Sequence, residues 1–305
     1  ALIARLLADG IQVRLVTRRA EQALDDPLLS QVGVIGGDPT QVGEWQDAID
    51  GQDAVIHLVG QPVFGRRWSR SIKRAIRDSR VQSSDRIREA IQRAHRPPSV
   101  LVSASAVGFY GPHGQEWLDE GSPPGSDFLA RVCEEWEAAA ARTQSESTRV
   151  AIVRVGIVLA RGAGMLETLS PIIKYVPGGA SPVGNARSSW LPGTGGQWIP
   201  WIHLDDIVGV FLRAMSDPRA VGPINGVAPE PVTNAEFLRA LARRLRRPYL
   251  PIGPPEQLLR LLLGEVATLV THGQRVVPKR ALELGYSFRF PRLAEALDDL
   301  FAAAD

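Results

Sequence analysis

The order of apolar and polar positions predicts short strands that alternate with amphipathic helices. Apolar residues recur at helical spacing over residues 1–9 and stop at Gly10, so the chain starts on a helix. Apolar or alternating runs predict strands at 11–16, 33–35, 53–58, 99–103 and 150–155. An apolar face that includes Ile76 and Ile87 predicts a long helix at 69–93. This order is typical of an α/β protein of Rossmann type with a doubly wound parallel sheet.

The first predicted helix has no strand before it. A Rossmann unit begins with a strand and a glycine-rich turn that feeds the first helix, and the first residue here is not Met. The glycines at 178–179 and 193–196 do not replace this turn, because they lie in a stretch rich in Pro, Gly and Ser. We therefore expect a first strand and its glycine loop, roughly a dozen residues or more, to be missing.

The remaining pattern predicts a large domain and a small one. We place a dinucleotide-binding domain at 1–248, with substrate-side insertions at 160–200, and a small C-terminal domain at 249–305. The irregular stretch at 176–200 indicates a lid. The C-terminal domain either packs over the substrate side or makes a homodimer contact.

Capping residues indicate where helices begin after residue 200. Asp205 or Asp206 can cap a helix at 207–215, and Thr233 with Glu236 forms a capping box. Apolar helices are expected at 256–270 and 293–301.

Composition limits the partners. The 305 residues carry a net charge of +2, and the arginines at 243–247 end a helix, so nucleic acid is not expected as a partner. Polar residues interrupt every apolar stretch before the roughly 20 residues that a membrane span needs. A single cysteine, Cys133, suits a reducing compartment. We expect a cytoplasmic protein that binds a small molecule, with no metal site.

Polar residues follow several predicted strands, where open α/β sheets bind ligands. Ser103, Ser105 and Tyr110 follow the strand at 99–103 and are candidate catalytic groups. For Ser103, a hydroxyl bonded to the backbone is an equally good interpretation. Without a cation nearby, Tyr110 would keep a pKa near 10, so it would act as a proton donor rather than as a base.

The first two strand ends indicate the cofactor. Thr17 and Arg18 end the strand at 11–16, and an arginine there can pair with the 2′-phosphate of NADP. A solvated turn is the alternative for Arg18. Asp38 either contacts adenine or forms an Asx turn before Pro39. Gly60 follows the strand at 53–58 and lets the backbone approach a cofactor.

Several blocks together resemble the atypical extended short-chain dehydrogenases of the nucleoside-diphosphate-sugar epimerase-like family. They cover nearly the whole chain and occur in the family's order: Leu58-Val59-Gly60, Ser79-Arg80, 103–111, Trp136-Glu137, 154–159, 201–206 and 225–229. The resemblance implies that Leu58, Val59, Arg80, Val155 and Gly156 also contact the cofactor. It further implies a nucleotide sugar or a small carbonyl compound as substrate.

The family's usual Tyr and Lys, spaced four residues apart, are absent. None of the four tyrosines is followed four places on by lysine. When Glu137 is aligned with the family's helical Glu, Leu129 and Cys133 occupy the two positions. Two functions follow. One is an NADP-dependent reductase or epimerase in which Ser105 and Tyr110 handle the substrate oxygen, and the other is a non-catalytic protein that senses NADP(H).

Overall fold

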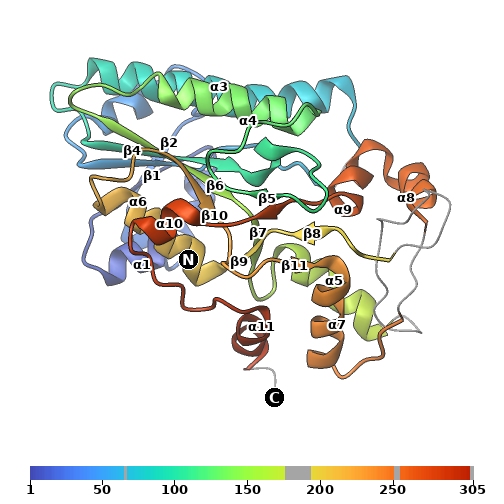
Figure 1. Ribbon diagram of the computed structural model, residues 1–305. Helices are drawn as coiled ribbons and strands as arrows, with labels where there is room; N and C mark the ends of the chain where they lie inside the picture. The colour runs from blue at the N-terminus through green and yellow to red at the C-terminus, as the bar shows by residue number, and fades with distance from the viewer. Residues whose placement is uncertain (65–66, 176–193, 251–254, 303–305) are drawn as a thin grey trace.

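The computed structural model describes residues 1–64, 67–175, 194–250 and 255–302 (Figure 1). The predicted lid lies mostly outside the described residues, because its residues 176–193 are not among them. No helix in the described ranges is long and apolar enough to cross a membrane.

A parallel sheet forms the centre of the molecule. Its four strands follow the order β10-β6-β4-β3, and a separate parallel pair joins β1 to β2. The strands are β1 (Arg14–Thr17), β2 (Gly33–Gly36), β3 (Ala54–His57), β4 (Val100–Ala106), β6 (Arg149–Val155) and β10 (Gly222–Gly226). The fold class predicted from the sequence is confirmed: this is a Rossmann-type parallel sheet with flanking helices.

Helices cover both faces of the sheet (Figure 1). Figure 1 shows α3 (Arg70–Arg93) and α4 (Phe128–Ala141) on one face, and α1 (Leu2–Ala8), α6 (Leu204–Ser216) and α10 (Lys279–Glu283) on the other. Side chains alternate along the strands accordingly. Leu101 of β4 packs in the core with Ile87 and Ile91 of α3, whereas Val102 packs in the core with Phe211 of α6. A sheet covered on both faces needs the apolar strands that the sequence shows.

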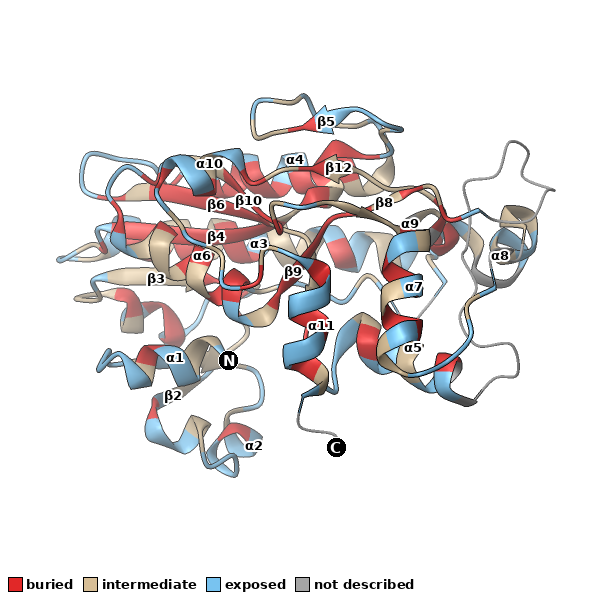
Figure 2. Ribbon diagram, turned by 60° about the horizontal axis from the view of Figure 1, so that its bottom comes forward, coloured by how far each residue is buried: buried red, intermediate tan, exposed pale blue. Residues whose placement is uncertain are grey.

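A second layer of short strands and helices extends from the sheet. It contains β7 (Ile157–Leu159), β9 (Trp201–His203), β8 (Trp198–Ile199), β11 (Val232–Thr233), α5 (Gly164–Tyr175), α7 (Asn234–Arg244) and α11 (Leu293–Phe301). One core joins α5, α7 and α11, with Ile173, Phe237 and Leu297 among its buried residues. Figure 2 shows these buried faces turned toward one another.

The remaining elements are short. They are α2 (Ala20–Leu24), β5 (Trp117–Leu118), α8 (Glu256–Leu263), α9 (Thr268–Thr271) and β12 (Arg275–Val276), with 3-10 turns at Leu29–Gln31, Glu44–Ile49, Val107–Tyr110 and Gly264–Ala267. β5 and β12 pair in parallel, so the C-terminal segment adds a strand beside the loop that follows β4.

Several elements differ from the sequence prediction, and β1 begins at Arg14 and not at Ile11. β4 continues to Ala106, beyond the predicted end at Ser103. The helix predicted at 256–270 is broken at Gly264, whose φ of 65° lies in the left-handed region. α6 begins at Leu204 and not at 207, and its cap is His203, whose imidazole accepts from the Asp205 N–H. The predicted caps Asp205 and Asp206 lie inside the helix.

The predicted boundary at 248 stays a prediction. Residues after it contribute to two separate cores. Leu297 packs beside Phe237 in the α5–α7–α11 core, and Leu284 packs beside Phe211 under the sheet.

Candidate functional site

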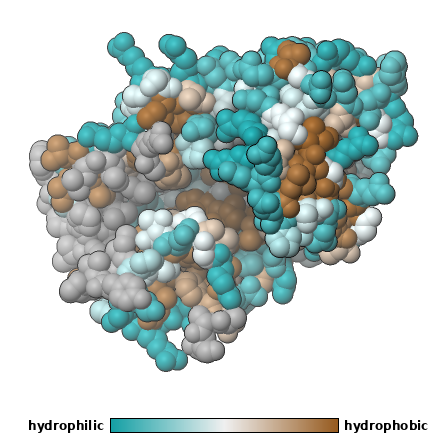
Figure 3. All heavy atoms as spheres, turned by 180° about the vertical axis from the view of Figure 1, so that it is seen from behind, coloured by the Kyte–Doolittle hydropathy of each residue, from teal (hydrophilic) through white to brown (hydrophobic). Residues whose placement is uncertain are grey.

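The strand ends bring most of the predicted site residues to one edge of the sheet. Register pairs Thr17 with Gly36, His57 with Ser103, and Val155 with both Ala106 and Gly226. The strands are parallel within the four-stranded sheet and within the β1–β2 pair, so the carboxyl ends of each set share one edge. Figure 3, seen from behind Figure 1, shows the molecular surface hollowed, with apolar side chains at the bottom of the hollow.

Thr17, Arg18 and Asp38 lie together at the first two strand ends. The Gly37 N–H donates to the Thr17 carbonyl at 3.0 Å, which joins the two loops. Asp38 Oδ1 accepts from the Thr40 N–H at 2.9 Å, which is the Asx turn that was one interpretation of Asp38. This backbone hydrogen bond lowers the pKa of Asp38, and the nearby Arg18 charge lowers it further. Arg18 itself is exposed and makes no ion pair within the described residues.

His57 shapes the loop that contains Leu58, Val59 and Gly60. Its imidazole is buried, and Nδ1 accepts from the Val59 N–H at 3.3 Å. Nε2 lies 3.1 Å from the Ser83 hydroxyl. That hydroxyl donates to the Ser79 carbonyl, so Nε2 carries the imidazole proton. Burial lowers the pKa of His57 to about 4, and the charge of Arg80 adds to this effect, so the ring is neutral at physiological pH.

Arg80 reaches back from α3 to the same loop. Its guanidinium donates to the carbonyls of Gln61 and Ile76 and lies 5.1 Å from the Trp136 ring centre. A Cβ at Gly60 would stand 3.0 Å from this guanidinium, so glycine provides the space that Arg80 fills. Within the described residues, Arg80 has no carboxylate partner. A positive charge therefore lies beside the β3 strand end, and contact of Arg80 with a cofactor stays a prediction.

Val155 and Gly156 lie at the connection between β6, which ends at Val155, and β7, which begins at Ile157. The Gly156 N–H donates to the Gly226 carbonyl, and a Cβ at Gly156 would collide with the Pro200 carbonyl oxygen. Only glycine fits this crossing of three segments. Contact of these two residues with a cofactor stays a prediction.

Ser103, Ser105 and Tyr110 are all buried. Ser103 donates to the Ala104 carbonyl at 3.1 Å, a strand hydroxyl bonded to backbone. Ser105 donates to Glu137 Oε1 at 2.7 Å. Tyr110 donates to Asn225 Oδ1 at 2.7 Å. Each hydroxyl proton is therefore already engaged by a protein acceptor, and a catalytic role for the three stays a prediction.

A buried ion pair connects these hydroxyls. Arg154 binds Glu137 through two parallel hydrogen bonds of 2.8 Å, and both side chains are almost fully buried. Arg154 also donates to the Tyr110 hydroxyl at 3.0 Å, and its guanidinium lies 3.5 Å from the Phe109 ring centre. The sequence analysis placed no cation beside Tyr110, and Arg154 corrects this. Burial nevertheless outweighs Arg154 and raises the pKa of Tyr110 to about 12.

Asn225 and Glu120 extend this network toward the C-terminal segment. Asn225 Nδ2 donates to the Val277 carbonyl, and the Asn225 N–H donates to Glu120 Oε1. The Arg280 N–H donates to the same oxygen. Sequence reasoning did not single out Arg154 or Glu120. A signal was available for Arg154, because a charge in the apolar strand at 150–155 needs a buried partner.

Leu129 and Cys133, which the alignment places at the family's Tyr and Lys positions, face the turn that follows β4. A Cβ at Gly108 would lie 3.6 Å from Leu129 Cβ and 3.9 Å from Cys133 Sγ. Burial raises the pKa of the Cys133 thiol to about 12, with the Glu137 carboxylate as a further cause. The thiol therefore stays protonated, so these two positions supply no substitute for the Tyr and Lys.

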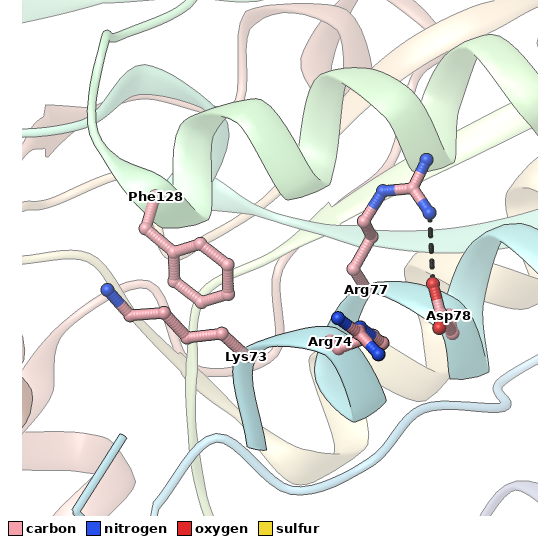
Figure 4. A pocket seen from close by; sticks show the side chains of 5 residues that line it. All are labelled: Lys73, Arg74, Arg77, Asp78 and Phe128. Carbon is pink, nitrogen blue, oxygen red and sulfur yellow. Dashed lines mark hydrogen bonds and ion pairs between the residues drawn. The ribbon is translucent and has the colours of Figure 1, made fainter. Parts of the chain in front are cut away.

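A basic hollow of about 470 Å³ lies beside this region, between the first turns of α3 and α4 (Figure 4). Figure 4 shows the Phe128 ring beside Lys73, and Arg77 bonded to Asp78. Lys73 also pairs with Glu265, and Arg77 pairs with Glu135. Much of the positive charge that lines the hollow is thus neutralised by carboxylates of the protein.

Fold and site together define a dinucleotide-binding α/β protein. The family model described as "NAD dependent epimerase/dehydratase family" matches residues 1–226, and this chain belongs to that family. A second model, described as a domain of unknown function (DUF1731), matches residues 254–300.

Named relatives cover most of the chain. It is 39% identical over 302 residues to the chloroplastic epimerase family protein SDR39U1 homolog of Arabidopsis thaliana, covering 97% of this chain and 81% of that protein. It is 36% identical to mouse SDR39U1, with 82% of each chain covered. The crystal structure of human SDR39U1 (isoform 2) with NADPH superposes with a TM-score of 0.85 at 31% identity, over 99% of this chain and 95% of that one.

Proposed function

We propose that this chain binds NADP(H) along the carboxyl edge of its sheet. The observation that carries the proposal is the row of groups at that edge: exposed Arg18 at the end of β1, the Gly60 loop with Arg80 after β3, and Gly156 after β6. The relative crystallised with NADPH supports the choice of cofactor.

The residues present fit such a cofactor. Arg18 would hold the 2′-phosphate, because it is exposed and makes no ion pair within the described ranges. Arg80 would offer positive charge beside Gly60, where its guanidinium occupies the space that a side chain would take. A bound nicotinamide supplies a hydride donor or acceptor.

The substrate would occupy the hollow next to this edge, and we propose a nucleotide sugar or a small carbonyl compound. Structural neighbours support this class only through the fold. One of them, MoeE5 in complex with UDP-glucose and NAD, superposes with a TM-score of 0.74 at 19% identity. The Ser105 hydroxyl donates its hydrogen bond to Glu137, so it would offer a substrate only the lone pairs of its oxygen. Such a serine would accept a hydrogen bond from an alcohol rather than donate one to a carbonyl.

A second candidate function is cofactor sensing without turnover. The observation that favours it is that the Ser105 and Tyr110 hydroxyls both donate their hydrogen bonds to acceptors within the protein, Glu137 and Asn225. In this case the network would transmit cofactor binding from the β4 strand end to the C-terminal segment, through Asn225 and Val277.

Variants at Ser105 and Tyr110 separate the two functions. NADPH binding is measured by calorimetry, and NADPH oxidation is followed by absorbance with a panel of carbonyl compounds and nucleotide sugars, with product analysis for epimers. An enzyme loses turnover in Ser105→Ala and in Tyr110→Phe and keeps its cofactor affinity. A sensor binds NADPH and turns over no panel member. Failure of the unaltered protein to bind NADPH contradicts the proposal itself.

A further inference from the structure

Arg275 has an aromatic ring on each side and, among the described residues, no counter-ion. Its guanidinium carbon lies 3.5 Å from the Trp117 ring centre and 4.1 Å from the Trp198 ring centre. Its Nε is buried and has no hydrogen-bond acceptor. Within the part of the chain that the structure describes, Arg275 makes no ion pair. A buried donor without an acceptor is rare in folded proteins and calls for a ligand or an ordered solvent molecule.

Three segments hold this arrangement in place. β5 and β12 pair Trp117 directly with Arg275, and the neighbouring Leu118 and Val276 point to the opposite, buried face. Trp198 comes from β8, and its indole N–H donates to Gln115 Oε1 at 2.9 Å. Gly273 allows the close approach, because a Cβ there would collide with the Trp198 carbonyl oxygen. Figure 2 shows β5, β12 and β8 beside one another.

The two indoles decide which part of the guanidinium can bind. They occupy its flat faces, so only the N–H edge is left for a partner. An acceptor that meets this edge in the plane is a carboxylate or a phosphate, which can take two parallel N–H bonds. Trp117 is 57% exposed, so the group opens to solvent at one end.

Nearby acidic side chains do not neutralise Arg275. Glu116, on the same loop as Trp117, is paired weakly with His113 at 3.8 Å. Asp119 is paired with Lys279 at 2.9 Å. Both carboxylates therefore have other partners.

We propose that Arg275, Trp117 and Trp198 form a receptor for an oxyanion, the phosphate or carboxylate group of a small molecule. This receptor shares no residue with the proposed cofactor site. Arg275 lies on the segment 254–300, which matches a domain of unknown function, whereas Trp117 and Trp198 lie within residues 1–226. The proposal does not depend on the binding of NADP(H).

The test follows the N–H signals of arginine and tryptophan side chains by two-dimensional ¹H–¹⁵N NMR. The protein is titrated in separate experiments with inorganic phosphate and with acetate at constant ionic strength. We expect a saturable shift of the Arg275 Nε–H signal, together with the Trp117 and Trp198 indole signals. The anion that gives the tighter saturation identifies the class of ligand.

Arg239 is the matched control, because it is exposed and stacks on the Tyr249 ring at 4.9 Å, with no second ring among the described residues. Its Nε–H signal should move little and without saturation. Arg275→Lys keeps the charge and loses the planar edge, so anion affinity should fall about tenfold or more. Trp117→Leu leaves Arg275 in place and should weaken binding less.

Two results would overturn the proposal. One is the absence of any saturable shift at Arg275 with either anion, which would make the stack a purely structural clamp. The other is an equal shift at Arg239, which would show unspecific charge attraction. NADPH affinity of Arg275→Lys is measured in parallel and should be unchanged, so failure of the cofactor proposal is seen separately.

Discussion

At the residue scale, the Glu137 carboxylate supports the centre of the molecule. It accepts hydrogen bonds from Arg154 and from Ser105, and it lies beside the Cys133 thiol. When one partner of a buried ion pair is removed, the other charge is left in a medium that cannot solvate it. The effect of Glu137 on stability should therefore far exceed that of a surface carboxylate.

Glu137→Ala is expected to lower the free energy of unfolding by about 3–5 kcal/mol. Glu135→Ala on the same helix is the matched control. Glu135 pairs with Arg77 at the surface, so its loss should cost less than about 1 kcal/mol. Urea unfolding monitored by circular dichroism measures both. Similar losses in the two variants would contradict the assignment of a buried pair.

His57 gives a pH dependence whose sign can be derived. Its pKa is about 4 in the folded protein and about 6.5 in an unfolded chain. Between about pH 6.5 and pH 4, His57 is therefore protonated in the unfolded state and neutral in the folded state. Stability that is present above about pH 6.5 should be lost as the pH falls toward 4, by up to about 3 kcal/mol.

His57→Asn removes this titration and keeps an acceptor for the Val59 N–H. The variant should lose less stability than the unaltered protein between pH 7 and pH 4. Thermal unfolding at a series of pH values measures the difference. Parallel curves for the two proteins would show that His57 titrates normally.

At the element scale, one helix cap and the ranges of two helices were predicted from the sequence. The capping box of Thr233 and Glu236 is present as predicted, because a hydroxyl and a carboxylate at this spacing satisfy the free N–H groups of the first turn. The long α3 and the final α11 also match their predicted ranges. The predicted cap of α6 was wrong, because the imidazole of His203 caps this helix and not the carboxylate of Asp205 or Asp206.

Thr233→Ala should lower the free energy of unfolding by about 1 kcal/mol through loss of the α7 cap. Thr168, whose hydroxyl donates to the Gly164 carbonyl within α5, provides a control. Thr168→Ala should leave stability within about 0.5 kcal/mol, because alanine favours a helix interior. Equal effects would mean that the box does not stabilise the first turn of α7.

At the scale of the whole molecule, the sequence predicted the parallel sheet, and ligand binding at its carboxyl edge stays a prediction. Strand periodicity was enough for this, because parallel strands bring their carboxyl ends together. The burial of Ser105 and Tyr110 was not predictable. It depends on partners far apart in sequence: Glu137 for the serine, and Asn225 for the tyrosine. A local pattern that places a hydroxyl at a strand end cannot say whether its proton is already engaged.

The stack around Arg275 lay outside sequence reasoning for the same reason. Its three members come from β5, β8 and β12, which meet only in the folded chain. The sequence analysis gave the segment 249–305 no chemistry, and its described residues contribute to two cores.

The central claim is that Arg18 selects NADP(H) by its 2′-phosphate. Calorimetric titration of the protein with NADPH and with NADH tests it most directly, on the unaltered chain, on Arg18→Glu and on Arg19→Glu, the neighbouring exposed arginine as control. We predict that the unaltered protein binds NADPH more tightly than NADH. Arg18→Glu should lose about ten- to a hundredfold in NADPH affinity and change little in NADH affinity. Arg19→Glu should have a small effect on the affinity for either cofactor. Equal affinities for the two cofactors, or an unchanged preference in Arg18→Glu, would contradict the account.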